Sequence, residues 1–340
     1  MSGTELTAVA RAMVAPGKGI LAADESSPTI KKRFDMISAE STEENRRSYR
    51  EMLFTAPGAS KHISGVILFD ETLRQSTSDG TPFPEYLANR GVIPGIKVDK
   101  GAKALAGFPG ETVTEGLDGL RERLAEYREL GARFAKWRAV IDIGTGIPTD
   151  FCILANAHAL ARYAALCQEA GIVPIVEPEV LMDGAHDIER CGEVTSRTLD
   201  RTFAQLEAHR VALDGIVLKP NMVIPGMKCA RQASAEEVAE ATVSCLTANV
   251  PAQVPGIAFL SGGQSDTDAT AHLNAMNKLG PHPWELSFSY GRALQAAALS
   301  AWSGRAENFA AGQSAFSLRA KLNGLARTGA YDQSMESAAA

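Results

Sequence analysis

The chain has 340 residues, 45% of them hydrophobic and 22% charged, which is typical of a globular protein. Its formal net charge of −6 argues against nucleic acid as the main partner, and no apolar run reaches the roughly 18 residues that a membrane span needs. The segment Met1–Gly19 has no continuous apolar core, so we expect no signal peptide. The cysteines form no Cys-x-x-Cys pair, which favours reduced thiols in a cytoplasm over disulfides or a zinc site.

Short apolar runs alternate along the chain with longer segments of helical periodicity. The expected strands are 19–23, 65–69, 94 to about 99, 134–140, 173–179, 215–218, 256–260 and 284–290. The expected helices are a short N-terminal one at about 4–15, one beginning at Thr42, and others at about 117–130, 153–170, 196–210 and 234–246 and after 292 and 306. The last residues, about 325–340, are expected to form a mobile tail.

This alternation predicts an α/β fold in which residues 1–340 form a single (β/α)8 TIM barrel. A doubly wound open sheet is the alternative. Such a sheet would not usually bring charged residues from all its strand ends to one point, whereas a barrel does.

Lys219 ends a buried apolar run, and Pro220 prevents further strand pairing. Lysine is almost never fully buried unless it is paired. Burial and nearby cations lower the pKa of a lysine, and a free amine near neutral pH can attack a carbonyl to form a Schiff base. Taken alone, this stretch favours the simpler interpretation, a lysine that extends from the strand end to solvent.

In a barrel, the carboxyl ends of all strands meet on one face, where active sites form. The polar residues that this face would gather are Asp24, Lys97, Lys136, Arg138, Glu177, Glu179, Lys219, Ser261 and Arg292. Each alone is explained by a solvated loop, but their coincidence at strand ends favours a catalytic site. Neighbouring lysines disfavour each other's charged form, which can make one of them a nucleophile, and the acids can move protons as an imine forms and breaks.

Ser261-Gly262-Gly263 and Gly291-Arg292 follow the last two strands, where barrels commonly bind phosphate. Glycines let backbone N–H groups point at an anion, and arginine adds a charged fork. All six histidines lie away from the strand ends, whereas a metal-dependent aldol enzyme would need imidazoles there. We therefore expect no catalytic metal and no other cofactor.

At this point the chain resembles one family, class I fructose-bisphosphate aldolase, over nearly its whole length. The matching stretches are Gly19–Ser26, Thr42–Arg47, Gly65–Phe69, Gly95–Gly101, Phe134–Arg138, Ile172–Glu179, Leu218–Met222, Leu260–Ser265 and Phe288–Leu294. The resemblance implies reversible cleavage of fructose 1,6-bisphosphate to dihydroxyacetone phosphate and glyceraldehyde 3-phosphate, in glycolysis and gluconeogenesis. It also implies a cytoplasmic homotetramer whose partner is a sugar bisphosphate.

The resemblance implies that Lys219 forms the Schiff base, that Glu177 is its acid and base, and that Asp24 takes the hydroxyl proton as the carbon–carbon bond breaks. Lys136 would hold the sugar hydroxyls. The supporting residues would be Lys97, Arg138 and Glu179. The phosphate next to the ketone would bind to Ser261, Gly262, Gly263, Ser289, Gly291 and Arg292, and the far phosphate to Arg33 and Arg46.

The chain departs from the family's pattern at two positions. Pro28 stands where many members have a glycine, which would stiffen the loop before Arg33. Many members end in a tyrosine that reaches the active site, whereas the last tyrosine here is Tyr331. We hypothesise that Tyr331 replaces it in returning a proton to the bound product; the alternative is that water or a barrel acid does so.

Two alternative functions remain at this stage. One is another Schiff-base barrel, such as a transaldolase or a keto-acid aldolase; two phosphate sites would favour the bisphosphate substrate. The other is a non-catalytic scaffold that binds sugar phosphates, against which the presence of Lys219, Glu177 and Asp24 argues.

Overall fold

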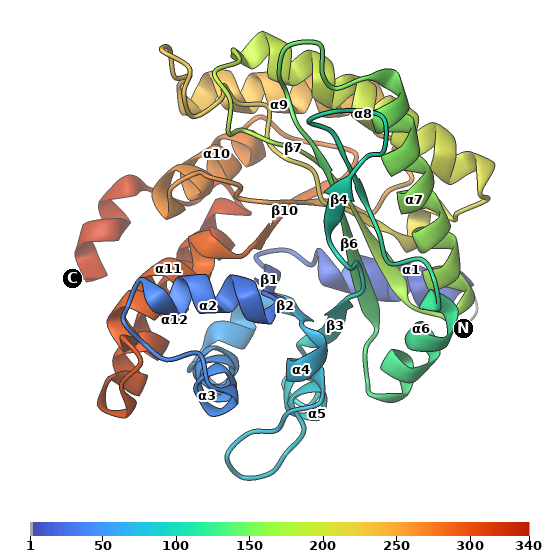
Figure 1. Cartoon of the computed structure of the whole chain (residues 1–340). Helices are drawn as coiled ribbons and strands as arrows, with labels where there is room; N and C mark the ends of the chain where they lie inside the picture. Colours follow the sequence, from blue (N-terminus) through green and yellow to red (C-terminus); the bar gives the residue numbers. More distant parts are fainter. Residues whose placement is uncertain (1–2, 340) are drawn as a thin grey trace.

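The computed structural model describes residues 3–339. Its centre is a closed barrel of parallel strands in the order β1-β10-β9-β8-β7-β6-β3-β2 (Figure 1). These strands are β1 Gly19–Ala23, β2 Ile63–Leu68, β3 Ile93–Lys97, β6 Phe134–Ile141, β7 Val173–Val180, β8 Val217–Leu218, β9 Gly256–Phe259 and β10 Glu285–Tyr290. The predicted (β/α)8 class is confirmed, and each strand lies within about two residues of its expected range.

Helices surround the barrel and connect its strands (Figure 1). The helices are α1 Gly3–Met13, α2 Ser27–Asp35, α3 Glu43–Phe54, α4 Asp70–Leu73, α5 Phe83–Ala88, α6 Leu120–Glu129, α7 Asp150–Glu169, α8 Ile188–Ala208, α9 Ala235–Asn249, α10 Asp266–Lys278, α11 Arg292–Trp302 and α12 Phe309–Ala326. The start of α8 was predicted eight residues too late. Asp187 caps this helix by accepting from the Arg190 N–H at 2.8 Å, and the first turns bury small residues such as Cys191 and Thr195 rather than large apolar ones.

Residues 27–35 form α2, where the sequence suggested only a basic cluster after β1. Pro28 lies in the first turn of this helix. At that position its missing N–H breaks no hydrogen bond and its fixed φ suits the helix. The proline therefore fixes the beginning of the helix that carries Arg33.

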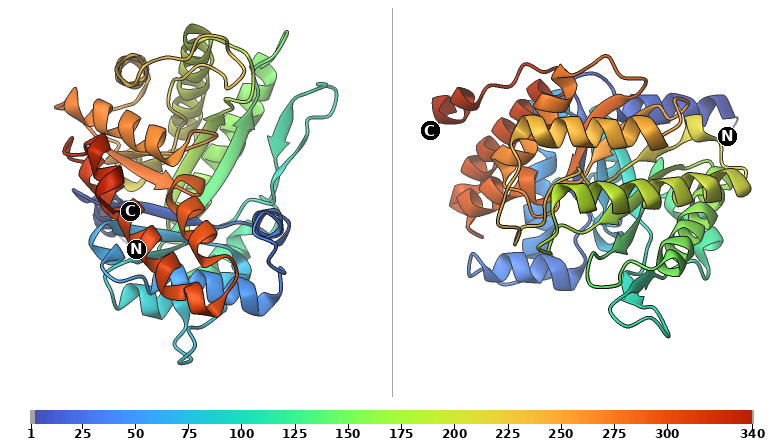
Figure 2. Two further views of the ribbon diagram at one scale, coloured as in Figure 1. Left: turned by 90° about the vertical axis from the view of Figure 1, so that its left-hand side faces the viewer. Right: turned by 90° about the horizontal axis from the view of Figure 1, so that it is seen from above.

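A two-stranded hairpin, β4 Ala102–Ala104 and β5 Thr112–Thr114, interrupts the connection between β3 and β6. Figure 2 shows the hairpin extending from the barrel. It is attached through hydroxyl groups, because Thr112 donates to the Val140 carbonyl at 3.1 Å and Thr114 donates to the Arg138 carbonyl at 2.7 Å. The hairpin therefore lies beside the strand that carries Lys136 and Arg138.

The amino-terminal end of the barrel is closed by α1. Leu6, Ala10 and Met13 of this helix share one buried cluster with inward residues of the strands, including Phe134 and Val173. Gly19 makes room for a second aromatic ring, because a Cβ there would lie 2.5 Å from Phe288. With this end filled by apolar side chains, the polar residues of the barrel gather at the opposite, carboxyl end.

The residues after α12 pack against the barrel's helices. Tyr331 is 5% exposed; its N–H donates to Asn274 of α10 at 3.1 Å and its hydroxyl donates to Glu336 at 2.9 Å. Glu336 in turn forms an ion pair with buried Arg319 at 2.5 Å. A short 3-10 helix covers Gln333–Ala339. Tyr331 is thus held by α10 as well as by its own segment, with its hydroxyl bound to Glu336, and this arrangement does not support its predicted role at the active site.

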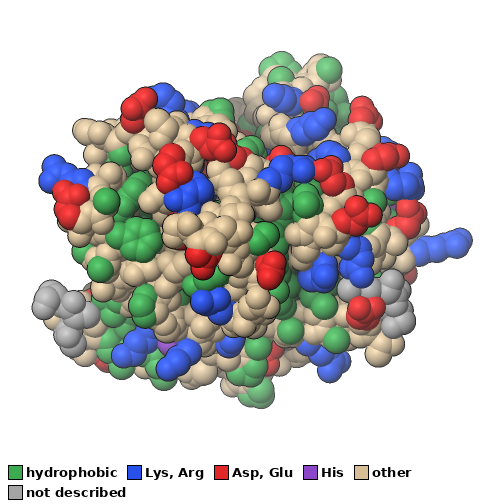
Figure 3. All heavy atoms as spheres, turned by 90° about the horizontal axis from the view of Figure 1, so that it is seen from below, with side chains coloured by type: hydrophobic (Ala, Val, Ile, Leu, Met, Phe, Trp, Pro, Cys, Tyr) green, Lys and Arg blue, Asp and Glu red, His purple; other side chains and the backbone are tan. Residues whose placement is uncertain are grey.

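The surface carries charges of both signs. Figure 3 shows acidic and basic side chains side by side over one face, separated by small apolar patches. Within residues 3–339, no helix combines the length and the apolar character needed to cross a bilayer.

Candidate active site

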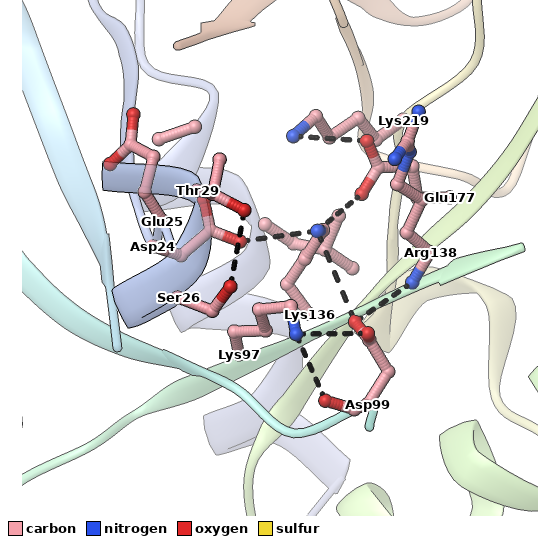
Figure 4. A network of polar contacts seen from close by, with 12 residues as sticks. Asp24, Glu25, Ser26, Thr29, Lys97, Asp99, Lys136, Arg138, Glu177 and Lys219 are labelled. Carbon is pink, nitrogen blue, oxygen red and sulfur yellow. Dashed lines mark hydrogen bonds and ion pairs between the residues drawn. The ribbon is translucent and has the colours of Figure 1, made fainter. Parts of the chain in front are cut away.

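Two lysines share one buried carboxylate at the carboxyl end of the barrel. Lys219 directly follows β8, and its Nζ lies 3.2 Å from Glu177 Oε1, while Lys136 Nζ lies 3.2 Å from Glu177 Oε2 (Figure 4). All three residues are at most 4% exposed. Burying these charges is tolerable because each has an opposite charge within ion-pair distance.

Two further acids extend this network. Lys136 Nζ also lies 3.1 Å from Asp24 Oδ2 at the end of β1 and 4.0 Å from Asp99 Oδ2. Asp99 binds Lys97 Nζ at 3.1 Å through its other oxygen. The connected cluster therefore contains three ammonium groups and three carboxylates (Figure 4).

Strand register explains why these residues meet. Lys97 of β3 is paired with Lys136 of β6, and Arg138 of β6 is paired with Glu177 of β7. Alternate residues of a strand share a face, so Lys136 and Arg138 both point to the barrel's interior side, as do Glu177 and Glu179. Lys219 is held at the end of β8 because its N–H donates to the Val176 carbonyl at 2.8 Å.

Burial and neighbouring charges shift the pKa values of Asp24 and Lys136 in opposite directions. Burial raises the pKa of Asp24, but the ammonium groups of Lys136, Lys219 and Lys97 outweigh it and hold this pKa well below its usual value. Burial lowers the pKa of Lys136, but the carboxylates of Asp24, Glu177 and Asp99 hold this pKa above its usual value. Both residues are therefore charged near neutral pH.

Arg138 and Glu179 form a separate ion pair next to the network. The Arg138 backbone N–H donates to Asp99 at 3.4 Å, so this residue contacts the cluster through its main chain as well. Both acids of this region, Glu179 and Asp99, are buried. Arg138 and Glu179 thus lie beside the network, and within residues 3–339 neither forms an ion pair with a member of it.

The glycine-rich loop after β9 and the start of α11 lie at the same end of the barrel. Arg292 is exposed and its guanidinium donates to the Gly262 carbonyl. Gly262 has φ +55°, a left-handed conformation that glycine adopts readily. Ser261 and Ser289 are buried, and among residues 3–339 Ser289 Oγ has no hydrogen-bond partner. The loop therefore offers polar groups for an anion.

The two arginines that the family resemblance assigned to the far phosphate lie in different places. Arg33 Nη1 binds Glu25 at 2.5 Å, and its Nη2 would lie 3.8 Å from a Cβ on Gly291. Arg33 therefore lies beside a residue that we had expected at the other phosphate. Arg46 makes a two-pronged ion pair with Glu71 and contacts no member of the network.

A cavity of about 320 Å³ opens next to the network. Among its lining residues are Asp24, Arg33, Lys97, Lys136, Arg138 and Gly291. The described part of the chain contains no group of three or more His, Cys, Asp or Glu side chains that could hold a metal ion. The cavity is thus lined by side chains suited to proton transfer and to binding oxygen-rich anions.

Comparison with known proteins places this geometry in one family. The family model "Fructose-bisphosphate aldolase class-I" matches residues 5–340. The chain belongs to the class I fructose-bisphosphate aldolase family.

The relatives and structures of this aldolase family match along nearly the whole chain. The chain is 63% identical to a probable class 1 fructose-bisphosphate aldolase of Xanthomonas campestris, over 97% of this chain and 99% of that protein. It is 57% identical to the cytosolic fructose-bisphosphate aldolase 6 of Arabidopsis thaliana, over 96% of this chain and 91% of that protein. The structure of the Plasmodium falciparum aldolase superposes with a TM-score of 0.95 at 51% identity, covering 97% and 95% of the two chains. Fold, family and reaction class thus agree with the predictions.

Two acids that contact the candidate site residues were missed by sequence reasoning. Asp99 joins Lys97 to Lys136, and Glu25 binds both Arg33 and Arg50, the latter at 2.6 Å. Each acid lies one or two residues from a predicted site residue, and this adjacency was the only signal in the sequence. Their partners come from other parts of the chain, so the contacts themselves could not be read.

Proposed function

We propose that Lys219 is the nucleophile of this class I aldolase, which cleaves fructose 1,6-bisphosphate and condenses its products. The observation that carries the proposal is the 3.2 Å contact between Lys219 Nζ and Glu177, a carboxylate that also contacts Lys136. A buried acid at this distance can take protons from the attacking amine and return one to the departing water.

In the proposed reaction, the Lys219 amine attacks the ketone carbon, Glu177 transfers the protons, and water leaves as the protonated imine forms. The imine then accepts the electron pair of the breaking carbon–carbon bond, so that no metal is needed as an electron sink. Asp24 accepts the proton of the neighbouring hydroxyl and releases the aldehyde product. The resulting enamine is protonated at carbon, and hydrolysis frees the ketone product and Lys219.

Lys136 is proposed to bind the sugar hydroxyls next to Asp24. Its 3.1 Å contact lowers the basicity of Asp24, so a substrate hydroxyl that inserts between the two groups would restore part of it. Lys97, Arg138 and Glu179 are proposed to hold these residues in place. Their ion pairs with Asp99 or with each other support this role.

The phosphate groups are proposed to bind at the rim of the site. Buried Ser261 and Ser289 and exposed Arg292 would hold the phosphate next to the ketone; the backbone donors of this subsite would be Gly262, Gly263 and Gly291. Arg33 lines the cavity and is proposed to hold the far phosphate. Arg46 is proposed as a more distant contributor, because it must first leave Glu71.

Borohydride trapping tests the proposal. Reduction of the wild-type enzyme with bound dihydroxyacetone phosphate should attach the ligand to Lys219, as located by peptide mass spectrometry. Lys219→Ala should abolish trapping and turnover, whereas Lys103→Ala, on the exposed hairpin, should trap as wild type does. Trapping at Lys136 or Lys97 would refute the assignment. Absence of any trapping would favour the non-catalytic scaffold.

We further propose a cytoplasmic homotetramer. The reduced cysteines and the cytosolic or cytoplasmic names of plant relatives support the location, and the family resemblance supports the assembly. Light scattering of the purified chain should give four times the monomer mass; a monomer at micromolar concentration would refute the assembly.

A further inference from the structure

Two methionine side chains lie on the glycine loop, although no step of the proposed mechanism uses them. The Gly263 N–H donates to Met182 Sδ at 3.0 Å. A Cβ atom added to Gly263 would lie 2.5 Å from Met227 Sδ and 3.4 Å from Met182 Sδ. Both sulfur atoms are therefore packed against the backbone of this loop, and one of them already accepts a hydrogen bond from it.

The two methionines are held there by pairing between the loops that carry them. Met182 follows β7 and Met227 follows β8. Three backbone hydrogen bonds join the two loops: Met227 N–H to Met182 C=O at 2.7 Å, Gly226 N–H to His186 C=O at 2.8 Å and Lys228 N–H to Gly184 C=O at 3.0 Å. The two loops that carry the thioethers are thus hydrogen-bonded to each other, which holds both side chains beside Gly263.

The two side chains differ in their access to solvent. Met182 is 5% exposed, whereas Met227 is 51% exposed. A thioether must meet its oxidant to react, so Met227 is the member of the pair that a dissolved oxidant reaches. Met36, at the end of α2, is 75% exposed and is a comparison residue that does not touch the glycine loop.

Oxidation changes what Met227 offers to the loop. A thioether sulfur is a weak hydrogen-bond acceptor, so a charged phosphate oxygen displaces it readily. Methionine sulfoxide is polar and carries an S=O oxygen, which is a much stronger acceptor. Placed against Gly263, this oxygen would compete with phosphate for the loop's N–H groups and for the nearby Arg292 guanidinium.

We propose that Met227 is an oxidation site through which hydrogen peroxide weakens binding of phosphorylated ligands. The sulfur donates an electron pair to one peroxide oxygen and the O–O bond breaks. The transferred oxygen gives its proton to the other oxygen, so that the sulfoxide S=O bond forms and water leaves. Sulfur is oxidised and peroxide is reduced. The proposal rests on the assignment of the Ser261–Gly263 loop to phosphate under Proposed function.

The test compares wild type, Met227→Leu and the matched surface control Met36→Leu before and after peroxide. After catalase quenching, dithiothreitol reverses oxidation of thiols such as Cys229, and peptide mass spectrometry locates the remaining added oxygen. The readout is the ratio of the dissociation constants for dihydroxyacetone phosphate after and before treatment. We expect a roughly three- to tenfold increase in wild type and in Met36→Leu, no increase in Met227→Leu, and recovery with methionine sulfoxide reductases.

Three results would overturn the proposal: Met227 sulfoxide without a change in affinity, equal loss of affinity in Met227→Leu, or no oxidation of Met227 under conditions that oxidise Met36. Untreated Arg292→Ala, measured in parallel, separates this proposal from the one on which it rests. If Arg292→Ala binds dihydroxyacetone phosphate as wild type does, the phosphate assignment fails. If it binds more weakly while oxidation has no effect, only the role of Met227 fails.

Discussion

Glu25→Gln should separate the stability of the fold from the positioning of a substrate-binding arginine. Glu25 is buried and accepts from Arg33 at 2.5 Å, from Arg50 at 2.6 Å and from Gln295 at 3.0 Å. Glutamine keeps the size of the side chain and removes its charge. Arg50 is 2% exposed, so its guanidinium would be left in the interior without an opposite charge.

The magnitude follows from the exposure of the two arginines. Removing one partner of a buried ion pair costs about 3–5 kcal/mol. The Arg33 side chain is 16% exposed and can regain some water, so most of the loss comes from Arg50 and we expect about 3 kcal/mol. Arg33 would also lose its anchor beside Gly291. A charge-assisted contact is worth about 1.5–3 kcal/mol, so the KM for fructose 1,6-bisphosphate should rise roughly tenfold or more.

Urea unfolding and steady-state kinetics measure the two effects on the same preparation. Glu44→Gln is the control, because Glu44 pairs with Arg47 at the surface with 69% of its side chain exposed, and its free energy of unfolding should change by less than about 1 kcal/mol. Equal stability of Glu25→Gln and wild type would refute the argument about buried charge. Lower stability with an unchanged KM would show that Glu25 supports the fold but does not position Arg33.

Three further predictions concern the metal, the pH and the terminal segment. Because the proposed electron sink is an imine, EDTA should leave turnover unchanged; activity lost to EDTA and restored by zinc would refute this. Because the folded-state pKa of Asp24 is lowered, its ionised carboxylate stabilises the fold. This stabilisation is fully present above the unfolded-state pKa of about 3.9 and is lost as the pH falls through the folded-state pKa. Below about pH 4, the urea midpoint of wild type should therefore fall relative to the midpoint of Asp24→Asn. A constant difference between the two midpoints from about pH 7 to pH 3 would contradict this. The Tyr331 hydroxyl is bound to Glu336, so Tyr331→Phe should lower the free energy of unfolding by about 1 kcal/mol and leave turnover unchanged. Slower turnover of this variant, with an imine that borohydride still traps, would instead support Tyr331 as a proton donor.

The barrel could be predicted because short apolar runs, most of them ending in polar residues, alternate with longer helical segments along the chain. The hairpin β4–β5 could not be predicted, since its strands are only three residues long and the residues of β4 are exposed. The late start assigned to α8 has a similar cause. Its first turns bury Cys191, Val194 and Thr195, which do not stand out as a helical stripe in the sequence.

Most candidate site residues could be named because they occupy strand ends, where the fold itself brings distant parts of the chain together, whereas Arg33, Arg46 and Ser289 were named only from the family resemblance. What could not be predicted are contacts between side chains on different elements. Glu25 meets Arg50 of α3 and Gln295 of α11, and Met182 meets Gly263. Nothing in the local pattern around these residues reveals such partners, because they are set by the packing of helices and loops around the barrel.

The network around Lys136 contains as many ammonium groups as carboxylates. This balance affects how the enzyme responds to ionic strength. A cluster without net charge exerts little long-range attraction on a sugar bisphosphate, so attraction must come from arginines at the rim, such as exposed Arg292. Interactions of exposed charges are screened over a Debye length of about 8 Å at physiological salt. Added salt should therefore slow capture of the substrate, while the buried ion pairs that move protons keep their strength.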